Sequence, residues 1–264
     1  LATLARHAEA VVGVDTGLTH LSAALGTPTV AVFTTTDATL AGVARTGAHA
    51  IDVGGNGTVP AFDDVATALG RVLLWMALPF LPLRLWWRGR REPGYRERIG
   101  ERFGRYGGLR VPRGTDVIWI HAVSLGETRA AAPLVARIAR DLPAATILLT
   151  HMTATGREAG RALYGSGVVQ AWLPYDFPFA VRAFLAHFAP RAGLLMETEL
   201  WPNLAAACTV ARVPLFLVNA RLSERSFAGY RRFAALTEPM FASLAGVAAQ
   251  TADDAARIAA AGAT

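Results

Sequence analysis

The sequence predicts an α/β fold in which parallel strands are covered by helices. Short runs rich in β-branched residues alternate with helical runs along the whole chain, and turn residues separate them. Of the 264 residues, 53% are hydrophobic. The chain can therefore bury a core and is long enough for one large or two modest domains.

The first part of the chain has a strand, helix, strand and helix pattern. We expect strands at 10–15 ("AVVGVD") and 28–33 ("PTVAVF"), with helices at 19–26 and 62–74. Near Leu73 the composition changes from glycine-rich and threonine-rich to apolar and arginine-rich. This change predicts a boundary that divides the chain into residues 1–72, a segment 73–92, and residues 93–264.

The second part has the longer strand and helix series. Six strands are expected, at 117–121, 146–150, 168–173, 193–196, 214–218 and 247–250. Helices fill the gaps, for instance 127–141 and 179–188. Four residues of the first of these helices form one apolar face, namely Ala131, Leu134, Val135 and Ile138.

The segment 73–92 has an apolar run broken by Pro79 and Pro82, and then the pair Trp86-Trp87 among arginines. A membrane-spanning helix needs about 20 apolar residues, so this run is too short to span. Paired tryptophans beside cations suit a membrane interface. A buried hairpin with a basic exit fits the pattern equally well.

The chain is basic, with 26 Lys+Arg against 20 Asp+Glu and a pI near 10.4. Many arginines cluster between Arg84 and Arg113. They could face anionic lipid or a phosphorylated substrate. A nucleic-acid partner is not expected, because no nucleic-acid-binding motif accompanies the cluster.

Several site classes are disfavoured. Cys208 is the only cysteine, which excludes an internal disulfide or a cysteine-based metal site. His121 and His151 end strands but have no standard metal-ligand spacing to carboxylates. No G-x-G-x-x-G fingerprint is present, so we do not expect a dinucleotide cofactor. For the reasons given above for cysteine and histidine, we expect no metal either. The chain begins at Leu1 rather than Met, and we expect a fragment.

The stretch "HAVSLGET" combines two signals at one glutamate. The spacing Ser124-x-x-Glu127 is that of a capping box, in which a serine and a glutamate satisfy free backbone donors at a helix start. Gly126 and Glu127 also lie on a strand-to-helix loop, at the sheet edge where α/β proteins bind ligands. Glu127 could therefore be a helix cap, a general base, or both.

Other charged motifs follow later strands. Glu197 and Glu199 end an apolar strand in "METELWPN", and both point to one side if the strand continues through them. An ion pair with a nearby arginine is the preferred interpretation for Glu199. Arg221 and Arg225 in "NARLSERS" could contact a phosphate or lie on a solvated helix start. Thr155-x-x-Glu158 is interpreted as a helix cap.

Near the start of the chain, "VVGVDTGLTHLSAALGTPTVAVF" places a glycine at a helix start after a strand. Such a corner can bind an anion through backbone N–H groups, although Asp15 or Thr16 could simply cap the helix. The run closely resembles lipopolysaccharide heptosyltransferases. The resemblance covers about seventy residues and implies nucleotide-sugar contacts by Thr16, Gly17, Leu18 and His20.

From about residue 73 the motifs "LWWRGRREPGYRERIGERFG", "IHAVSLGET", "THMTATGRE", "LLMETELWPNL" and "VPLFLVNARLSERSFAGY" occur in order. Together they resemble the 3-deoxy-D-manno-octulosonic acid (Kdo) transferases. The resemblance implies a GT-B glycosyltransferase with two Rossmann-like domains, of which this chain holds the acceptor-binding one. It is preceded here by a partial Rossmann-like segment.

The resemblance also implies roles for individual residues. Glu127 would be the proton acceptor and Glu197 would stabilise the transition state. Ser124, Gly126, Arg221 and Arg225 would bind substrate. The substrates would be CMP-Kdo and the lipid A precursor, joined with inversion at the cytoplasmic face of the inner membrane.

Because the CMP-Kdo-binding domain is expected to be missing, this chain alone is expected to bind without turnover. Two alternatives remain open. One is a non-catalytic, membrane-associated lipid-binding module, and the other is part of a fused heptosyltransferase and Kdo transferase.

Overall fold

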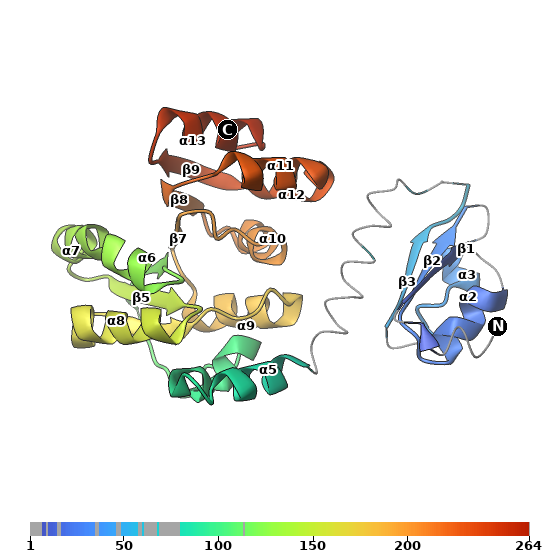
Figure 1. Cartoon of the computed structure of the whole chain (residues 1–264), viewed down its shortest axis with the longest axis horizontal. Helices are drawn as coiled ribbons and strands as arrows, with labels where there is room; N and C mark the ends of the chain where they lie inside the picture. Colours follow the sequence, from blue (N-terminus) through green and yellow to red (C-terminus); the bar gives the residue numbers. More distant parts are fainter. Residues whose placement is uncertain are drawn as a thin grey trace. The chain divides into compact units, whose positions relative to one another are not determined.

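The chain folds into two compact units, Leu1–Arg84 and Leu85–Thr264. The computed structural model describes residues 7–8, 10–14, 17–34, 37–45, 49–57, 60, 68, 80–112 and 114–263. Figure 1 shows the elements of each unit along the chain. The boundary expected near Leu73 stays a prediction, because residues 69–79 lie outside the described part.

The first unit contains a parallel sheet of three strands in the order β1-β2-β3. Its elements are β1 (Val11–Val14), α2 (Gly17–Ala24), β2 (Thr29–Phe33), α3 (Ala38–Ala41) and β3 (Ala50–Gly54). The sequence prediction for β1, α2 and β2 is confirmed, whereas β3 was not expected. The helix expected at 62–74 lies outside the described residues apart from Ala68.

The second unit is built on six parallel strands in the order β6-β5-β4-β7-β8-β9. They are β4 (Val117–His121), β5 (Thr146–His151), β6 (Val169–Trp172), β7 (Ala192–Met196), β8 (Leu215–Ala220) and β9 (Leu244–Ala249). The chain runs outward from β4 to β6 and then returns to the other side of β4. This is the doubly wound order of Rossmann-like sheets, as predicted.

Helices join these strands in the second unit (Figure 1). They are α6 (Leu125–Ala130), α7 (Ala132–Asp141), α8 (Ala154–Tyr164), α9 (Pro178–Phe188), α10 (Pro202–Ala211), α11 (Glu224–Arg232), α12 (Ala234–Ala242) and α13 (Ala252–Ala260). The single helix expected at 127–141 is wrong, because the chain breaks into α6 and α7 at Ala131. Pro133 explains the break: it has no N–H to donate inside a helix but fits a first turn.

Alternate residues of the central strand β4 point into two different cores. Val117 and Trp119 pack with residues of α9, α10 and α12. Ile118 and Ile120 pack with Val135 and its neighbours on the other face. A period of two is the expected consequence of strand geometry. The single thiol, Cys208 of α10, lies in the first of these cores, where burial raises its pKa to about 12.

Helix α5 (Phe80–Arg88) carries an exposed aromatic surface. Phe80 is 68% exposed, Trp86 48% and Trp87 64%. The interpretation of this stretch as a buried hairpin is therefore wrong over residues 80–88. Within the described residues, no helix combines the length and apolar character needed to cross a bilayer.

Candidate active site

The candidate site lies where the chain reverses its direction of travel across the sheet. Strand β4 pairs with β5 on one side and with β7 on the other. The carboxyl ends of β4 and β7 thus lie at the topological switch point, where open α/β sheets bind ligands. The first turn of α6, after β4, carries Glu127, and the turn after β7 carries Glu197 and Glu199. We call these three residues the glutamate site.

Glu127 forms the predicted capping box at the start of α6. Ser124 is the N-cap, and its hydroxyl accepts from the Glu127 N–H at 3.3 Å. The same hydroxyl donates to Glu127 Oε1 at 2.8 Å, and the Val123 N–H donates to Oε2 at 2.9 Å. These bonds fix the orientation of a carboxylate that is only 7% exposed. Because each carboxylate oxygen has two lone pairs, both oxygens keep an acceptor position.

The surroundings of Glu127 increase its affinity for a proton. Burial raises the pKa of its carboxyl group above the ordinary value, and the bonds from Val123 and Ser124 partly oppose this shift. The negative charges of Glu197 and Glu199 raise the pKa further. The fold therefore brings the three carboxylates close enough to interact. A carboxylate with a raised pKa is better matched to proton abstraction near neutral pH.

Glu197 does not continue strand β7, so the condition under which Glu197 and Glu199 would point to one side is not met. The strand ends at Met196, and Glu197 adopts a left-handed backbone conformation with φ of 57°. Its N–H still donates to Val218 O at 3.1 Å. A non-glycine residue in this region costs about 1 kcal/mol or more, and strained residues of this kind occur at active sites as well as at helix ends. The strained position lies at the switch point, next to the Glu127 loop.

Glu199 is half-buried and accepts a hydrogen bond from Trp201 Nε1 at 3.3 Å. No arginine of the described part of the chain forms an ion pair with it, so the ion-pair interpretation is wrong. The donor of the hydrogen bond to Glu199 is Trp201, two residues further along the chain. Glu199 lies close enough to Glu127 to contribute to the raised pKa of that carboxyl group.

The two predicted substrate-binding arginines follow β8, the neighbour of β7. Arg221 comes directly after the strand, and Arg225 lies in the first turn of α11. Both are exposed. Thr198 Oγ1 donates to the Arg221 carbonyl at 3.2 Å, which holds the loops after β7 and β8 together. Of the other predicted residues, Gly126 is exposed on α6, whereas Ser124 is already bonded to Glu127.

Two histidines end strands at the same edge but are fully buried. His121 Nδ1 lies 2.9 Å from Thr150 Oγ1, and His151 Nδ1 lies 2.9 Å from the Ala122 carbonyl. Burial lowers the pKa of His121 to about 3 and that of His151 to about 4. Among the described residues, no group of three or more His, Cys, Asp or Glu is arranged to hold a metal ion.

In the first unit, the predicted nucleotide-sugar residues fall at the carboxyl end of β1. Thr16 lies outside the described residues. Gly17 begins α2, Leu18 is 42% exposed, and His20 is half-buried in the next turn. This position agrees with an anion corner at a helix start, and the ligand contacts stay a prediction.

The sequence interpretation missed a buried charged cluster beside α8. The helix is capped by Thr153, whose hydroxyl accepts from the Gly156 N–H, so the cap assigned to Thr155 and Glu158 is wrong. Arg157 of α8 is buried, as is Arg102, and both guanidinium groups lie over the ring of Trp172. The sequence feature that could have revealed this cluster was Arg157 itself, which directly follows a glycine in a helix that packs closely on the sheet.

Comparison with known proteins gives two matches along the chain. Residues 97–264 match the family described as 3-deoxy-D-manno-octulosonic-acid transferase (kdotransferase). Residues 1–66 match glycosyltransferase family 9, the heptosyltransferases. Both resemblances noted in the sequence are therefore confirmed.

Individual relatives agree with the larger match. The 3-deoxy-D-manno-octulosonic acid transferase of Bordetella pertussis is 48% identical over 209 residues, which cover 74% of this chain and 47% of that protein. The enzyme of the same name from Haemophilus influenzae is 39% identical, over 61% of this chain and 37% of that protein. A probable mitochondrial 3-deoxy-D-manno-octulosonic acid transferase of Arabidopsis thaliana is also 39% identical, over 60% of this chain and 35% of that protein.

The chain thus spans less than half the length of each of these relatives. The family match nevertheless extends over most of the chain and includes every residue of the glutamate site. The chain belongs to the 3-deoxy-D-manno-octulosonic acid transferase family.

Proposed function

We propose that this chain supplies the acceptor-binding half of an inverting glycosyltransferase that moves Kdo from CMP-Kdo to the lipid A precursor. The observation that carries the proposal is the placement of Glu127. It is buried, held in one orientation by Val123 and Ser124, and raised in pKa by burial and by two further carboxylates at the switch point. Such a group is suited to take a proton from a bound hydroxyl.

In the proposed reaction, Glu127 accepts the proton of an acceptor hydroxyl as its oxygen forms the new bond to the anomeric carbon of Kdo. The bond from that carbon to CMP breaks, and CMP leaves with the electron pair. Positive charge develops on the sugar ring in between. The carboxylate of Glu197, fixed by its left-handed backbone, would stabilise that charge. Ser124 would position Glu127, while Gly126, Arg221 and Arg225 would contact substrate.

The acceptor is a lipid, and α5 is suited to meet it at a membrane surface. Trp86 and Trp87 are exposed, and the guanidinium of Arg90 lies 4.4 Å from the Trp86 ring. Indole rings favour the level of the headgroups, and nearby arginines attract anionic lipids. We propose that this helix rests on the cytoplasmic face of the inner membrane.

The test of the proposed base is Glu127→Gln in the full-length protein. Glutamine can take the same place in a capping box, so α6 should form as before. We expect the rate of Kdo transfer to fall about 10²-fold to 10⁴-fold, with an unchanged melting temperature. Glu238→Gln, at an exposed glutamate of α12, is the matched control. Turnover of Glu127→Gln within a few-fold of wild type would exclude Glu127 as the base.

A second candidate function is that of a non-catalytic, membrane-associated lipid-binding module. The exposed tryptophans of α5 favour it, since they need no catalytic residue to act. The match of residues 1–66 to the heptosyltransferases favours a further candidate. This is a fused heptosyltransferase and Kdo transferase in which Gly17, Leu18 and His20 contact a nucleotide sugar. Vesicle binding by a full-length protein that does not transfer Kdo would favour the module.

A further inference from the structure

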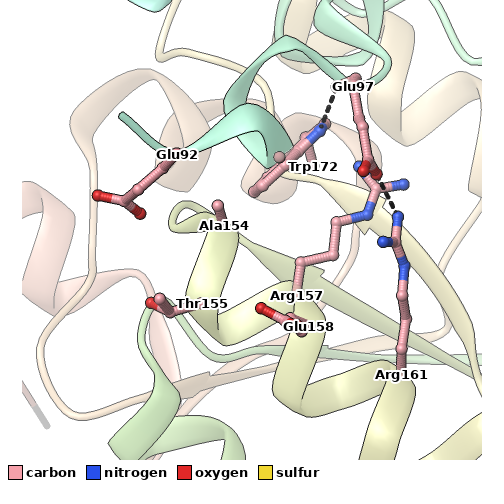
Figure 2. Close-up of a pocket in the computed structure, with 9 residues that line it drawn as sticks. Glu92, Glu97, Ala154, Thr155, Arg157, Glu158, Arg161 and Trp172 are labelled. Carbon is pink, nitrogen blue, oxygen red and sulfur yellow. Dashed lines mark hydrogen bonds and ion pairs between the residues drawn. The ribbon is translucent and has the colours of Figure 1, made fainter. Parts of the chain in front are cut away.

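A cavity of about 250 Å³ lies beside the first turns of α8. It shares no residue with the glutamate site. Its lining residues come from the segment before β4, from α8 and from the end of β6, namely Glu92, Gly94, Glu97, Ala154, Thr155, Arg157, Glu158, Arg161 and Trp172. Figure 2 shows the side chains of Arg157 and Arg161 beside Glu97, with Thr155 and Glu92 across from them. We call it the α8 cavity.

Arg157 is the least satisfied charged group of the described residues. It is 4% exposed, and its Nε and Nη1 are buried without a hydrogen-bond acceptor. Its Nη2 has no protein acceptor either, but it is not among the buried atoms. Arg102, which lies over the same tryptophan, differs because its Nη2 donates to the Met152 carbonyl at 3.0 Å. A buried guanidinium with no hydrogen bond is costly unless an anion pairs with it.

Glu101 forms an ion pair with Arg157 but no hydrogen bond. Its Oε2 lies 3.7 Å from Nη1 and already accepts from the Trp172 N–H at 2.9 Å. Glu97 is paired with Arg161 (Figure 2). The Nη2 of Arg157 is therefore left to donate a hydrogen bond to an anion in the cavity.

The other groups of the α8 cavity indicate what that anion is attached to. The N–H groups of Ala154 and Thr155, in the first turn of α8, have no acceptor among the described residues. Such groups at a helix start favour an anion. Glu92 and Glu158 form no ion pair within the described residues, and carboxylates of this kind accept bonds from hydroxyl or amino groups. An anion alone would meet two repelling carboxylates, whereas a sugar phosphate offers both kinds of group.

The size of the α8 cavity suits one part of a larger ligand. A volume of 250 Å³ holds about eight water molecules at about 30 Å³ each. That is below the range of about 300–1,000 Å³ for whole ligands. A single phosphorylated sugar residue would fill it, and a disaccharide would have to extend beyond it.

A single residue, Val123, connects this cavity to the glutamate site. The Val123 N–H donates to Glu127, while the Val123 carbonyl accepts from Thr153 Oγ1 at 2.7 Å. Thr153 is the N-cap of α8, whose next residues line the cavity. A ligand in the α8 cavity and a hydroxyl at Glu127 could thus belong to one extended acceptor.

We propose that the α8 cavity is a subsite for a phosphorylated sugar of the acceptor headgroup, with Arg157 as its anion-binding residue. This inference rests on the proposed function, because it assigns the subsite to the acceptor of that reaction. Arg157 is a binding residue here and takes no part in proton transfer.

The test is calorimetric titration of the 264-residue chain with three probes: glucosamine 1-phosphate, glucosamine and inorganic phosphate. We expect glucosamine 1-phosphate to bind at least about tenfold more tightly than either of the others, since a charge-assisted bond contributes about 1.5–3 kcal/mol. Arg157→Met should remove this preference. Arg140→Met, at an exposed arginine of α7 that does not line the cavity, should keep it.

Because Arg157 is buried, its replacement could unfold the chain, so a second variant is needed. Thr155 is exposed at the cavity, and Thr155→Trp should block the space and weaken sugar-phosphate binding without removing a buried group. Equal binding of glucosamine and its phosphate by the wild-type chain would overturn the proposal. So would inorganic phosphate binding as tightly as the sugar phosphate, or full binding by folded Arg157→Met or Thr155→Trp.

The outcome of the sugar-phosphate binding test is independent of the test of Glu127. If Glu127→Gln keeps its activity while sugar-phosphate binding still depends on Arg157, the proposed function fails and the subsite stands. If Glu127→Gln is inactive and no phosphate preference is found, the function stands and the subsite fails.

Discussion

The buried pair His121 and His151 predicts a steep loss of stability in mild acid. Both imidazoles are completely buried, and each is held at Nδ1 by a neighbouring strand or loop. Burial is the main cause of their low pKa values, about 3 and about 4, and His151 lowers the pKa of His121 further. The perturbation is a decrease of pH from 7 to 4.5, with and without the substitution His121→Asn.

The sign follows from which state binds the proton. In the unfolded chain a histidine has a pKa of about 6.5, so it takes up a proton below that pH. In the folded chain both histidines remain neutral down to pH 4.5, which lies above their folded pKa values. Stability is therefore complete above pH 6.5 and falls as the pH decreases. Each histidine contributes about 1.4 kcal/mol per pH unit, so the pair loses about 5 kcal/mol by pH 4.5.

The assay is urea unfolding at several pH values, followed by tryptophan fluorescence. Trp119 and Trp172 are fully buried in the second unit and report on its unfolding. His121→Asn should reduce the slope of unfolding free energy against pH by about 1.4 kcal/mol per unit. Leu163→Ala, at an exposed leucine of α8, removes no titratable group and should leave the slope unchanged. If His121→Asn and wild type give parallel curves between pH 6.5 and 4.5, the reasoning from burial is refuted.

Two further predictions concern a helix cap and helix α5. Asp176 accepts from two backbone N–H groups in the first turn of α10, so Asp176→Ala should lower the unfolding free energy by about 1–2 kcal/mol. Asp116→Ala, at an exposed carboxylate, should change it by less than about 0.5 kcal/mol, and equal losses would contradict the capping role. Replacing both Trp86 and Trp87 with alanine should weaken sedimentation with anionic vesicles about tenfold or more. Phe233→Ala, at another exposed ring, is the control, and an equal loss there would argue against α5 as the contact surface.

The strands of the second unit could be predicted from the sequence, because each is a short apolar run with turn residues at its ends. Residues 117–121 match β4 to the residue. Strand β3 was missed because it has Asp52 at its centre, which interrupts the apolar run. That carboxylate accepts hydrogen bonds from the N–H groups of Val43 and Ala44. No local sequence pattern predicts this tertiary interaction. The break at Ala131 was predictable from Pro133.

The glutamate site could be predicted only in part. The capping box at Glu127 follows from a spacing of three residues and is confirmed. The approach of Glu197 depends on β7 pairing with β4, and strand order is not encoded in any short motif. The left-handed turn at Glu197 likewise required the structure. The contacts of Arg157 could not be predicted, because they come from β6 and from the region before β4, which are far apart in the sequence.

The single thiol of the chain makes the molecule convenient for site-directed labelling. Cys208 is buried and its pKa is raised to about 12, so almost none of it is the reactive thiolate at neutral pH. A cysteine introduced at exposed Trp87 or Thr155 would therefore be the one readily modified position. Fluorophores at these two places could report separately on contact with lipid and on occupancy of the α8 cavity, in an otherwise unaltered protein.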